Sequence, residues 1–139
     1  MQGVMRHMKH LLLSASENYR LYWCHEEAQL EGVKENRIVV GYFSGQVECG
    51  CIDYHEKWIV TGGNGIIIYY MNKPYRNYEY GHEGLQWKEL WREKENKDWW
   101  PEVIFQTDER TVRVLMDINA NAAGVYDIDV YDLSIHRKL

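Results

Sequence analysis

The hydrophobic positions along the chain come mostly in short runs of β-branched and aromatic residues, separated by turns rich in Gly, Asn, Ser and Asp. From Arg37 onward this spacing is typical of an antiparallel β-meander. Upstream, two further runs predict a hairpin that turns at residues 16–18. The nine strands predicted in this way cover residues 10–14, 19–24, 37–43, 46–54, 58–61, 66–71, 102–107, 111–117 and 125–133.

One segment departs from the meander pattern. Trp87, Leu90 and Trp91 are spaced at i, i+3 and i+4 among Glu, Lys and Arg residues, which is the spacing of an amphipathic helix. A polar stretch at residues 96–98 follows the segment. We therefore expect one amphipathic helix near residues 83–95, packed against an end or a face of the sheet.

The pattern as a whole predicts a mainly β fold. The antiparallel meander of about nine strands would form a barrel or a two-layer sheet, with the helix beside it. A chain of 139 residues has the length of one domain of ordinary size. We therefore expect a single β-rich domain over residues 1–139, in which residues 1–8 are disordered.

Composition adds two features to this picture. The chain has 6 Trp and 11 Tyr but only 2 Phe, and Trp and Tyr suit surfaces that are apolar in one part and hydrogen-bonding in another. Its 16 Lys and Arg residues against 21 Asp and Glu residues leave a formal net charge of -5. This balance argues against nucleic-acid binding, which needs positively charged side chains to neutralise phosphates.

The negative charge is weighted toward the C-terminal third, because residues 99–139 carry 4 basic and 7 acidic residues. In the predicted last strand, apolar residues alternate with Asp127, Asp129 and Tyr131, so we expect one buried and one exposed face. Together with Asp132, the exposed face is a candidate binding surface. It would attract a basic partner, mainly by raising the association rate.

A second candidate surface is aromatic. Nine Trp and Tyr residues crowd into positions 69–100, and two interpretations are open. Either most of these rings belong to the core and seat the helix on the sheet, or a subset forms a recognition patch, since Tyr, Trp and Arg are enriched at interface hot spots. The candidates for such a patch are Tyr78, Tyr80, Trp87, Trp91 and Trp99.

Cysteine and histidine residues in the first half of the chain suggest a metal site as a weak alternative. Zinc is usually bound by such residues, and structural sites draw Cys pairs from turns. Cys49 and Cys51 instead lie two apart in a predicted strand, where packed core thiols are the more ordinary outcome. We expect no metal and no other cofactor. The candidate ligands for the alternative are Cys24, His25, Cys49, Cys51 and His55.

These observations favour a non-enzymatic, acidic protein-binding domain. A concrete version is an immunity or inhibitor protein that neutralises a basic toxin or nuclease. One alternative is a small-molecule or carbohydrate-binding β domain in which Trp and Tyr rings stack on the ligand, and another is a metal-dependent enzyme that uses the Cys and His residues.

The sequence also bears on location. No apolar run approaches the roughly 20 residues of a membrane-spanning helix, and no secretory signal pattern is evident. Three cysteines are too few for a disulfide framework and suit a reducing compartment. We therefore expect a cytoplasmic protein that binds a protein partner and neither membranes nor nucleic acid.

Overall fold

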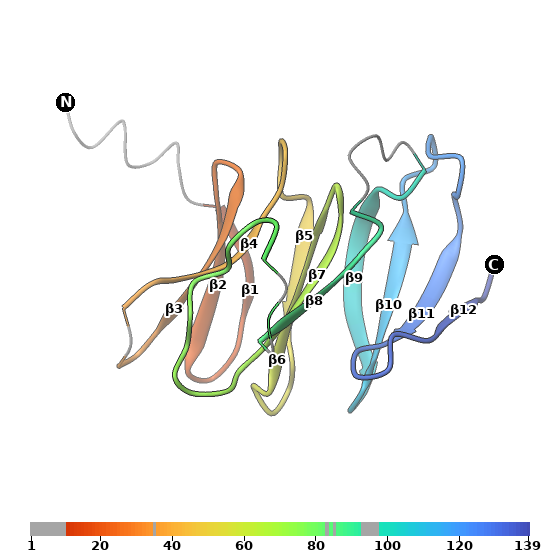
Figure 1. The fold of residues 1–139 in the computed structure, drawn as a ribbon. Coiled ribbons are helices and arrows are strands. Elements are labelled where there is room, and N and C mark those ends of the chain that lie inside the picture. Colours follow the sequence, from red (N-terminus) through yellow and green to blue (C-terminus); the bar gives the residue numbers. More distant parts are fainter. Residues whose placement is uncertain (1–10, 35, 83, 85, 93–97) are drawn as a thin grey trace.

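The computed structural model describes residues 11–34, 36–82, 84, 86–92 and 98–139. These residues form twelve β-strands and no helix, which confirms the mainly β prediction but not the predicted number of strands. The strands make three antiparallel sheets of four strands each, and strands that are neighbours in a sheet are consecutive in the chain. The sheets follow one another in chain order across the molecule (Figure 1). Within the described residues, nothing helical is long and apolar enough to cross a membrane.

The first four strands form what we call the N-terminal sheet. The predicted hairpin at its start is confirmed, because Ala15 pairs with Arg20 across the turn. Strand β3 was not predicted from the sequence, since Ala28 and Leu30 alternate there with Glu and Gln and no β-branched or aromatic residue marks the strand. The strands are β1 (Leu11–Ala15), β2 (Tyr19–Cys24), β3 (Glu27–Gly32) and β4 (Ile38–Tyr42).

The middle sheet is buried on both faces. Every residue of β6 and β7 is buried. Along β7, Ile67 packs toward the N-terminal sheet, whereas Ile66 and Ile68 pack toward the opposite side. The strands are β5 (Cys49–Ile52), β6 (Trp58–Gly63), β7 (Gly65–Tyr70) and β8 (Trp87–Leu90).

The last four strands form the C-terminal sheet. The alternation predicted for the last long strand is confirmed, because Tyr126 and Ile128 are buried while Asp127 and Asp129 are partly exposed. The short final strand was not predicted, and all three of its residues are exposed. The strands are β9 (Pro101–Asp108), β10 (Thr111–Met116), β11 (Val125–Asp129) and β12 (Ile135–Arg137).

The three sheets pack through two hydrophobic cores. One core joins the N-terminal sheet to the middle sheet, and it includes Leu21, Leu30 and Ile67. The other joins the middle sheet to the C-terminal sheet, and it includes Ile68 and Val114. The predicted barrel is not found, and three layers replace the predicted two, because both faces of the middle sheet are apolar and need a cover.

The helix predicted near residues 83–95 is wrong for the described part of that segment. Trp87–Leu90 form strand β8, which pairs with β7. Trp87 lies in the first core and Leu90 packs against the second, so apolar residues occur on both faces of the strand and imitate helical spacing. Trp91 follows with a positive φ of 58°. Residues 83, 85 and 93–95, like the predicted disordered residues 1–8, lie outside the described part.

Two carboxylates in the turn between β5 and β6 link the three sheets. Glu56 accepts hydrogen bonds from the backbone N–H and the side-chain amide of Asn18, both at 2.8 Å, and from the Ser16 hydroxyl. Asp53 is buried and accepts a hydrogen bond of 2.8 Å from the Gln106 side chain in β9. This turn of the middle sheet therefore holds the first hairpin on one side and the C-terminal sheet on the other.

Candidate functional site

The acidic face predicted on the last strand is largely neutralised by arginines. Asp127 accepts two hydrogen bonds from Arg113, at 2.7 and 2.9 Å. Asp129 accepts two from Arg110, at 2.5 and 3.1 Å. These bonds lower the pKa of both carboxyl groups, that of Asp129 to about 2, although burial acts in the opposite direction. The strand therefore presents ion pairs to solvent rather than unpaired carboxylates.

The other two residues of the predicted acidic surface lie beside the Arg110–Asp129 pair. The Tyr131 ring stacks on Tyr70 with the ring centroids 6.0 Å apart, and the Arg110 guanidinium lies 5.2 Å from the Tyr131 centroid. Asp132 is exposed and lies 4.0 Å from Arg110. The structure thus gathers Asp129, Tyr131 and Asp132 around one arginine, which offsets part of their charge.

The predicted aromatic patch separates into buried and exposed rings. Tyr78 and Trp87 lie in the first core, with their ring centroids 5.1 Å apart. Trp91 and Trp99 stack on each other at 4.2 Å and pack against the second core. Tyr80 is 59% exposed. Most of the candidates therefore lie in or against the cores, and Tyr80 alone of the five is largely exposed.

The Cys and His candidates for a metal site are not gathered in one place. Cys49 is buried in the second core and Cys51 packs against it, and burial raises the pKa of both thiols, that of Cys51 to about 12. Cys24 is buried in the N-terminal sheet, whereas His25 and His55 are exposed in turns. Among the described residues, no group of three or more His, Cys, Asp or Glu side chains could hold a metal ion.

An acidic cluster that sequence reasoning missed lies where β5 and β9 begin. Glu48 directly precedes β5, Glu102 is the second residue of β9, and Asp117 directly follows β10. Burial, together with the charges of Asp117 and Glu102, raises the pKa of Glu48. Within the described part of the chain, none of these three residues takes part in an ion pair. We call this cluster the acidic end.

A groove of about 670 Å³ lies along β1, β5 and β9, and its lining in β5 and β9 begins two residues beyond Glu48 and Glu102. β5 and β9 run in the same direction, because Cys49 contacts Pro101 at one end and Tyr54 bonds to Gln106 at the other. Phe105 is 43% exposed and Tyr54 is 69% exposed. We call this hollow the edge groove, and its lining consists of residues 13–17, 50–54 and 104–106.

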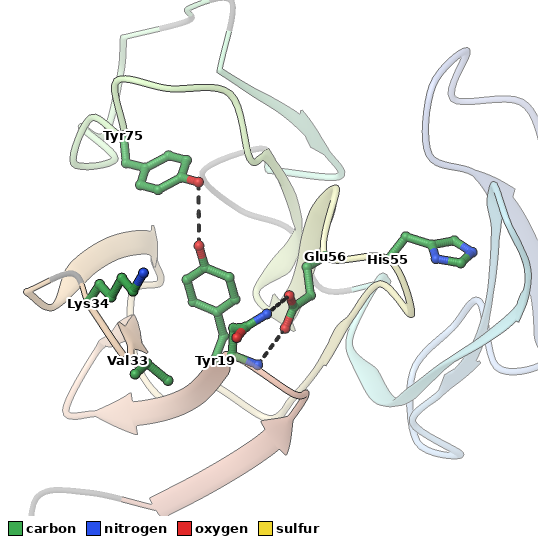
Figure 2. A pocket seen from close by; sticks show the side chains of 7 residues that line it. Tyr19, Val33, Lys34, His55, Glu56 and Tyr75 are labelled. Carbon is green, nitrogen blue, oxygen red and sulfur yellow. Dashed lines mark hydrogen bonds between the residues drawn. The ribbon is translucent and has the colours of Figure 1, made fainter.

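A second hollow, of about 370 Å³, lies beside the turn between β1 and β2. In Figure 2 the hydroxyl groups of Tyr19 and Tyr75 face each other, with the Lys34 side chain next to them. The two hydroxyl oxygens are 3.4 Å apart. We call this hollow the tyrosine pocket, and its lining consists of Asn18, Tyr19, Val33, Lys34, His55, Glu56 and Tyr75.

Comparisons with known proteins assign no family to the chain. No family model matches it, and no curated protein matches it. The features of the described residues that bear on function are the edge groove, the acidic end and the tyrosine pocket.

Proposed function

We propose that this protein is a non-enzymatic binding protein whose partner is a basic protein. The observation that carries this proposal is the acidic end. Glu48 and Glu102 adjoin the contact between Cys49 and Pro101, and Asp117 follows Met116, which pairs with Pro101. None of the three acidic residues has an ion-pair partner among the described residues. Mutual repulsion makes such a cluster unfavourable in the unbound protein. A Lys or Arg side chain from a partner would remove the repulsion and would also speed association.

A narrower form of the proposal is an immunity or inhibitor protein that neutralises a basic toxin or nuclease. Nucleases hold phosphates with basic surfaces, and the acidic end complements a surface of that kind. The net charge of -5 would strengthen long-range attraction to it. Binding should therefore weaken as salt concentration rises, because exposed charges are screened.

The acidic end can be tested by removing its charge. In a pull-down from the source cells, the wild-type protein should retain a basic protein, and a variant with Glu48→Gln, Glu102→Gln and Asp117→Asn should bind it at least about tenfold more weakly. A control variant with Glu31→Gln, Glu79→Gln and Glu109→Gln loses the same charge elsewhere and should bind normally. Equal binding by all three proteins would contradict the proposal.

The tyrosine pocket supports a second candidate function, which is small-molecule binding. Its volume of about 370 Å³ falls in the range of ligand sites, and its two tyrosine hydroxyls and Lys34 could donate hydrogen bonds to a polar ligand. NMR titration with small sugars and carboxylates should shift signals of Tyr19 and Lys34. The variant Tyr75→Ala should lose those shifts, and an unchanged response in this variant would exclude the pocket as the site.

A further inference from the structure

We propose that the edge groove takes up an extended segment of the partner protein, which adds a strand to the edge of β9. This inference rests on the proposed function, because it states how a basic protein would bind beside the acidic end. Strand addition supplies affinity through main-chain hydrogen bonds and specificity through alternate side chains.

Three sheet edges meet in the groove. Among the described residues, β1, β5 and β9 each pair with a strand on one side only. β5 lies against both β1 and β9. An edge strand presents backbone N–H and C=O groups that another chain can bind. At eight residues β9 is the longest of the three and therefore offers the longest edge.

The central edge segments in the groove lack the usual protection against such pairing, although β9 begins with Pro101 and Glu102. Soluble proteins commonly guard exposed edges with charged residues or proline. Neither occurs in the edge segments 13–15, 50–52 and 103–106. Acidic residues stand toward the ends instead: Glu17 and Asp53 line the groove at one end, and Glu48 and Glu102 precede its lining segments of β5 and β9 at the other. The groove therefore leaves its central edges open to another strand.

The side chains around the groove suit a segment with alternating apolar residues. Ile52 and Ile104 are buried beneath the groove, while Phe105 and Tyr54 remain exposed beside it. Exposed aromatic side chains of this kind often anchor partners at interfaces. Gln106 is already fixed, because its backbone carbonyl and side chain bond to Tyr54. The open part of the β9 edge therefore lies between Glu102 and Phe105.

Antiparallel pairing sets the direction of the added segment, and charge indicates where its basic residue would lie. β9 begins at the acidic end, since Glu102 is its second residue. All strand pairs in this protein's described sheets are antiparallel, and an added antiparallel strand would end where β9 begins. A Lys or Arg near the C-terminal end of the segment would then meet Glu48 and Glu102.

The probe for this proposal is the fluorescently labelled peptide Val-Thr-Val-Thr-Val-Lys with blocked termini, followed by fluorescence anisotropy. Replacing its Lys by Glu should weaken binding at least about tenfold. Two further peptides carry N-methyl groups on alternate residues, one on each set. Strand addition predicts that one methylated set abolishes binding and the other does not, because alternate N–H groups point toward and away from the paired edge.

Protein variants locate the binding in the groove. Phe105→Ala should weaken binding of the Lys peptide about tenfold, whereas Tyr80→Ala removes an exposed ring elsewhere and should leave binding unchanged. Combining Glu48→Gln with Glu102→Gln should make the Lys and Glu peptides bind equally. Amide hydrogen exchange measured with the wild-type protein should slow at residues 102–105 when the Lys peptide is bound.

The outcomes separate this inference from the proposed function. Equal binding of both methylated peptides, or no peptide binding at all, would overturn strand addition. If the cellular partner still requires the acidic end in that case, the proposed function stands and only the binding mode is wrong. If peptide binding behaves as expected while the cellular partner ignores the acidic end, strand addition is supported and the proposed function fails.

Discussion

At two places in this protein, the charged form of a carboxyl group has opposite effects on the stability of the fold. Asp129 forms an ion pair with Arg110, whereas Glu48 lies near the like charges of Asp117 and Glu102. Hydrogen bonds from a guanidinium favour the charged form of a carboxyl group, and nearby like charges disfavour it. The two groups should therefore respond in opposite directions to pH and to substitution.

Neutralising Glu48 should stabilise the protein. Glu48→Gln removes like-charge repulsion, so we expect the free energy of unfolding at pH 7 to rise by about 0.5 kcal/mol, a value that allows for solvent screening. Burial and the neighbouring charges raise the pKa of Glu48 in the folded state, so the folded protein binds this proton more readily than the unfolded chain. The advantage of the variant should accordingly vanish at low pH, where both states are protonated.

Urea denaturation at pH 7 and pH 3 measures this effect. Glu109→Gln is the control, because Glu109 is an exposed carboxylate in the turn between β9 and β10, and its stability should stay within about 0.3 kcal/mol of the wild type. A Glu48→Gln protein that is less stable than the wild type at pH 7 would contradict the prediction.

Removing the charge of Asp129 should destabilise the protein in a pH-dependent way. Its folded pKa of about 2 lies below the ordinary value, which is about 3.9. The stabilisation is therefore fully present above about pH 4 and is lost as the pH falls toward 2. We expect Asp129→Asn to lower the free energy of unfolding by about 1 kcal/mol at pH 7. Denaturation at pH 7, 4 and 2 should show the stability difference between the wild type and Asp129→Asn shrinking as the pH falls. A difference that stays constant would contradict the lowered pKa of Asp129.

The sequence of the last long strand alone could not predict that the carboxylates of the acidic face are paired with arginines. The alternation in β11 correctly predicted that Asp127 and Asp129 lie on the outward face of the strand. Their arginine partners come from β10 and the turn before it, and the register Arg113 to Asp127 depends on how the two strands pair. Local periodicity sets the face of a side chain, but its partner across a sheet depends on register.

At the level of elements, one turn holds the first hairpin in place. Burial opposes ionisation of Glu56, but the hydrogen bonds from Ser16 and Asn18 outweigh it and lower the pKa of this carboxyl group. Glu56 also adopts a positive φ of 58°, a conformation that few residues other than Gly favour. The charged, hydrogen-bonded side chain therefore compensates for an unfavourable backbone conformation.

Removing this carboxylate should loosen the hairpin. We expect Glu56→Ala to lower the free energy of unfolding by about 1–2 kcal/mol, because three donors lose their shared acceptor. Amide hydrogen exchange at residues 16–19 should accelerate more than exchange in β10. Glu17→Ala is the matched control, since Glu17 is an exposed carboxylate in the turn between β1 and β2 to which Glu56 bonds, and its removal should have little effect. Unchanged exchange at residues 16–19 in Glu56→Ala would show that the turn is held by other contacts.

Strands were predictable where apolar runs were dense and bounded by turns. All nine predicted strands overlap strands of the structure, but β3, β8 and β12 were missed. β8 was mistaken for a helix because its Trp87 and Leu90 face different cores. A short strand with apolar residues on both faces does not show the period of two by which strands are recognised.

At the scale of the whole molecule, the middle sheet determines the layered architecture. A strand buried on both faces reads as a continuous apolar run, and Ile66–Tyr70 has this form. That run was the signal for a third layer, although a short apolar run by itself does not reveal what covers each face. The acidic end was not predictable from local patterns, because pairing of β9 with β10 brings Glu102 near Asp117 and stacking of the middle sheet adds Glu48 from a third segment.

The two cores should unfold together. Ile67→Ala removes packing from the first core and Ile68→Ala from the second, and each should lower the free energy of unfolding by about 2–5 kcal/mol. Because β7 contributes to both cores, both variants should unfold in one transition with the same midpoint by fluorescence and circular dichroism. Separate transitions in either variant would show that the two interfaces are independent.

The consecutive pairing of strands also affects how the chain reaches its native state. Every strand pair within the described sheets joins neighbours in the sequence, so the contact order of the hydrogen-bonded ladders is low and their closure should be rapid. Stacking joins residues much further apart in the chain, and we expect it to be the slow step. During synthesis the middle sheet would emerge with one apolar face covered and the other exposed until the last four strands follow, which makes that interval the one most exposed to aggregation.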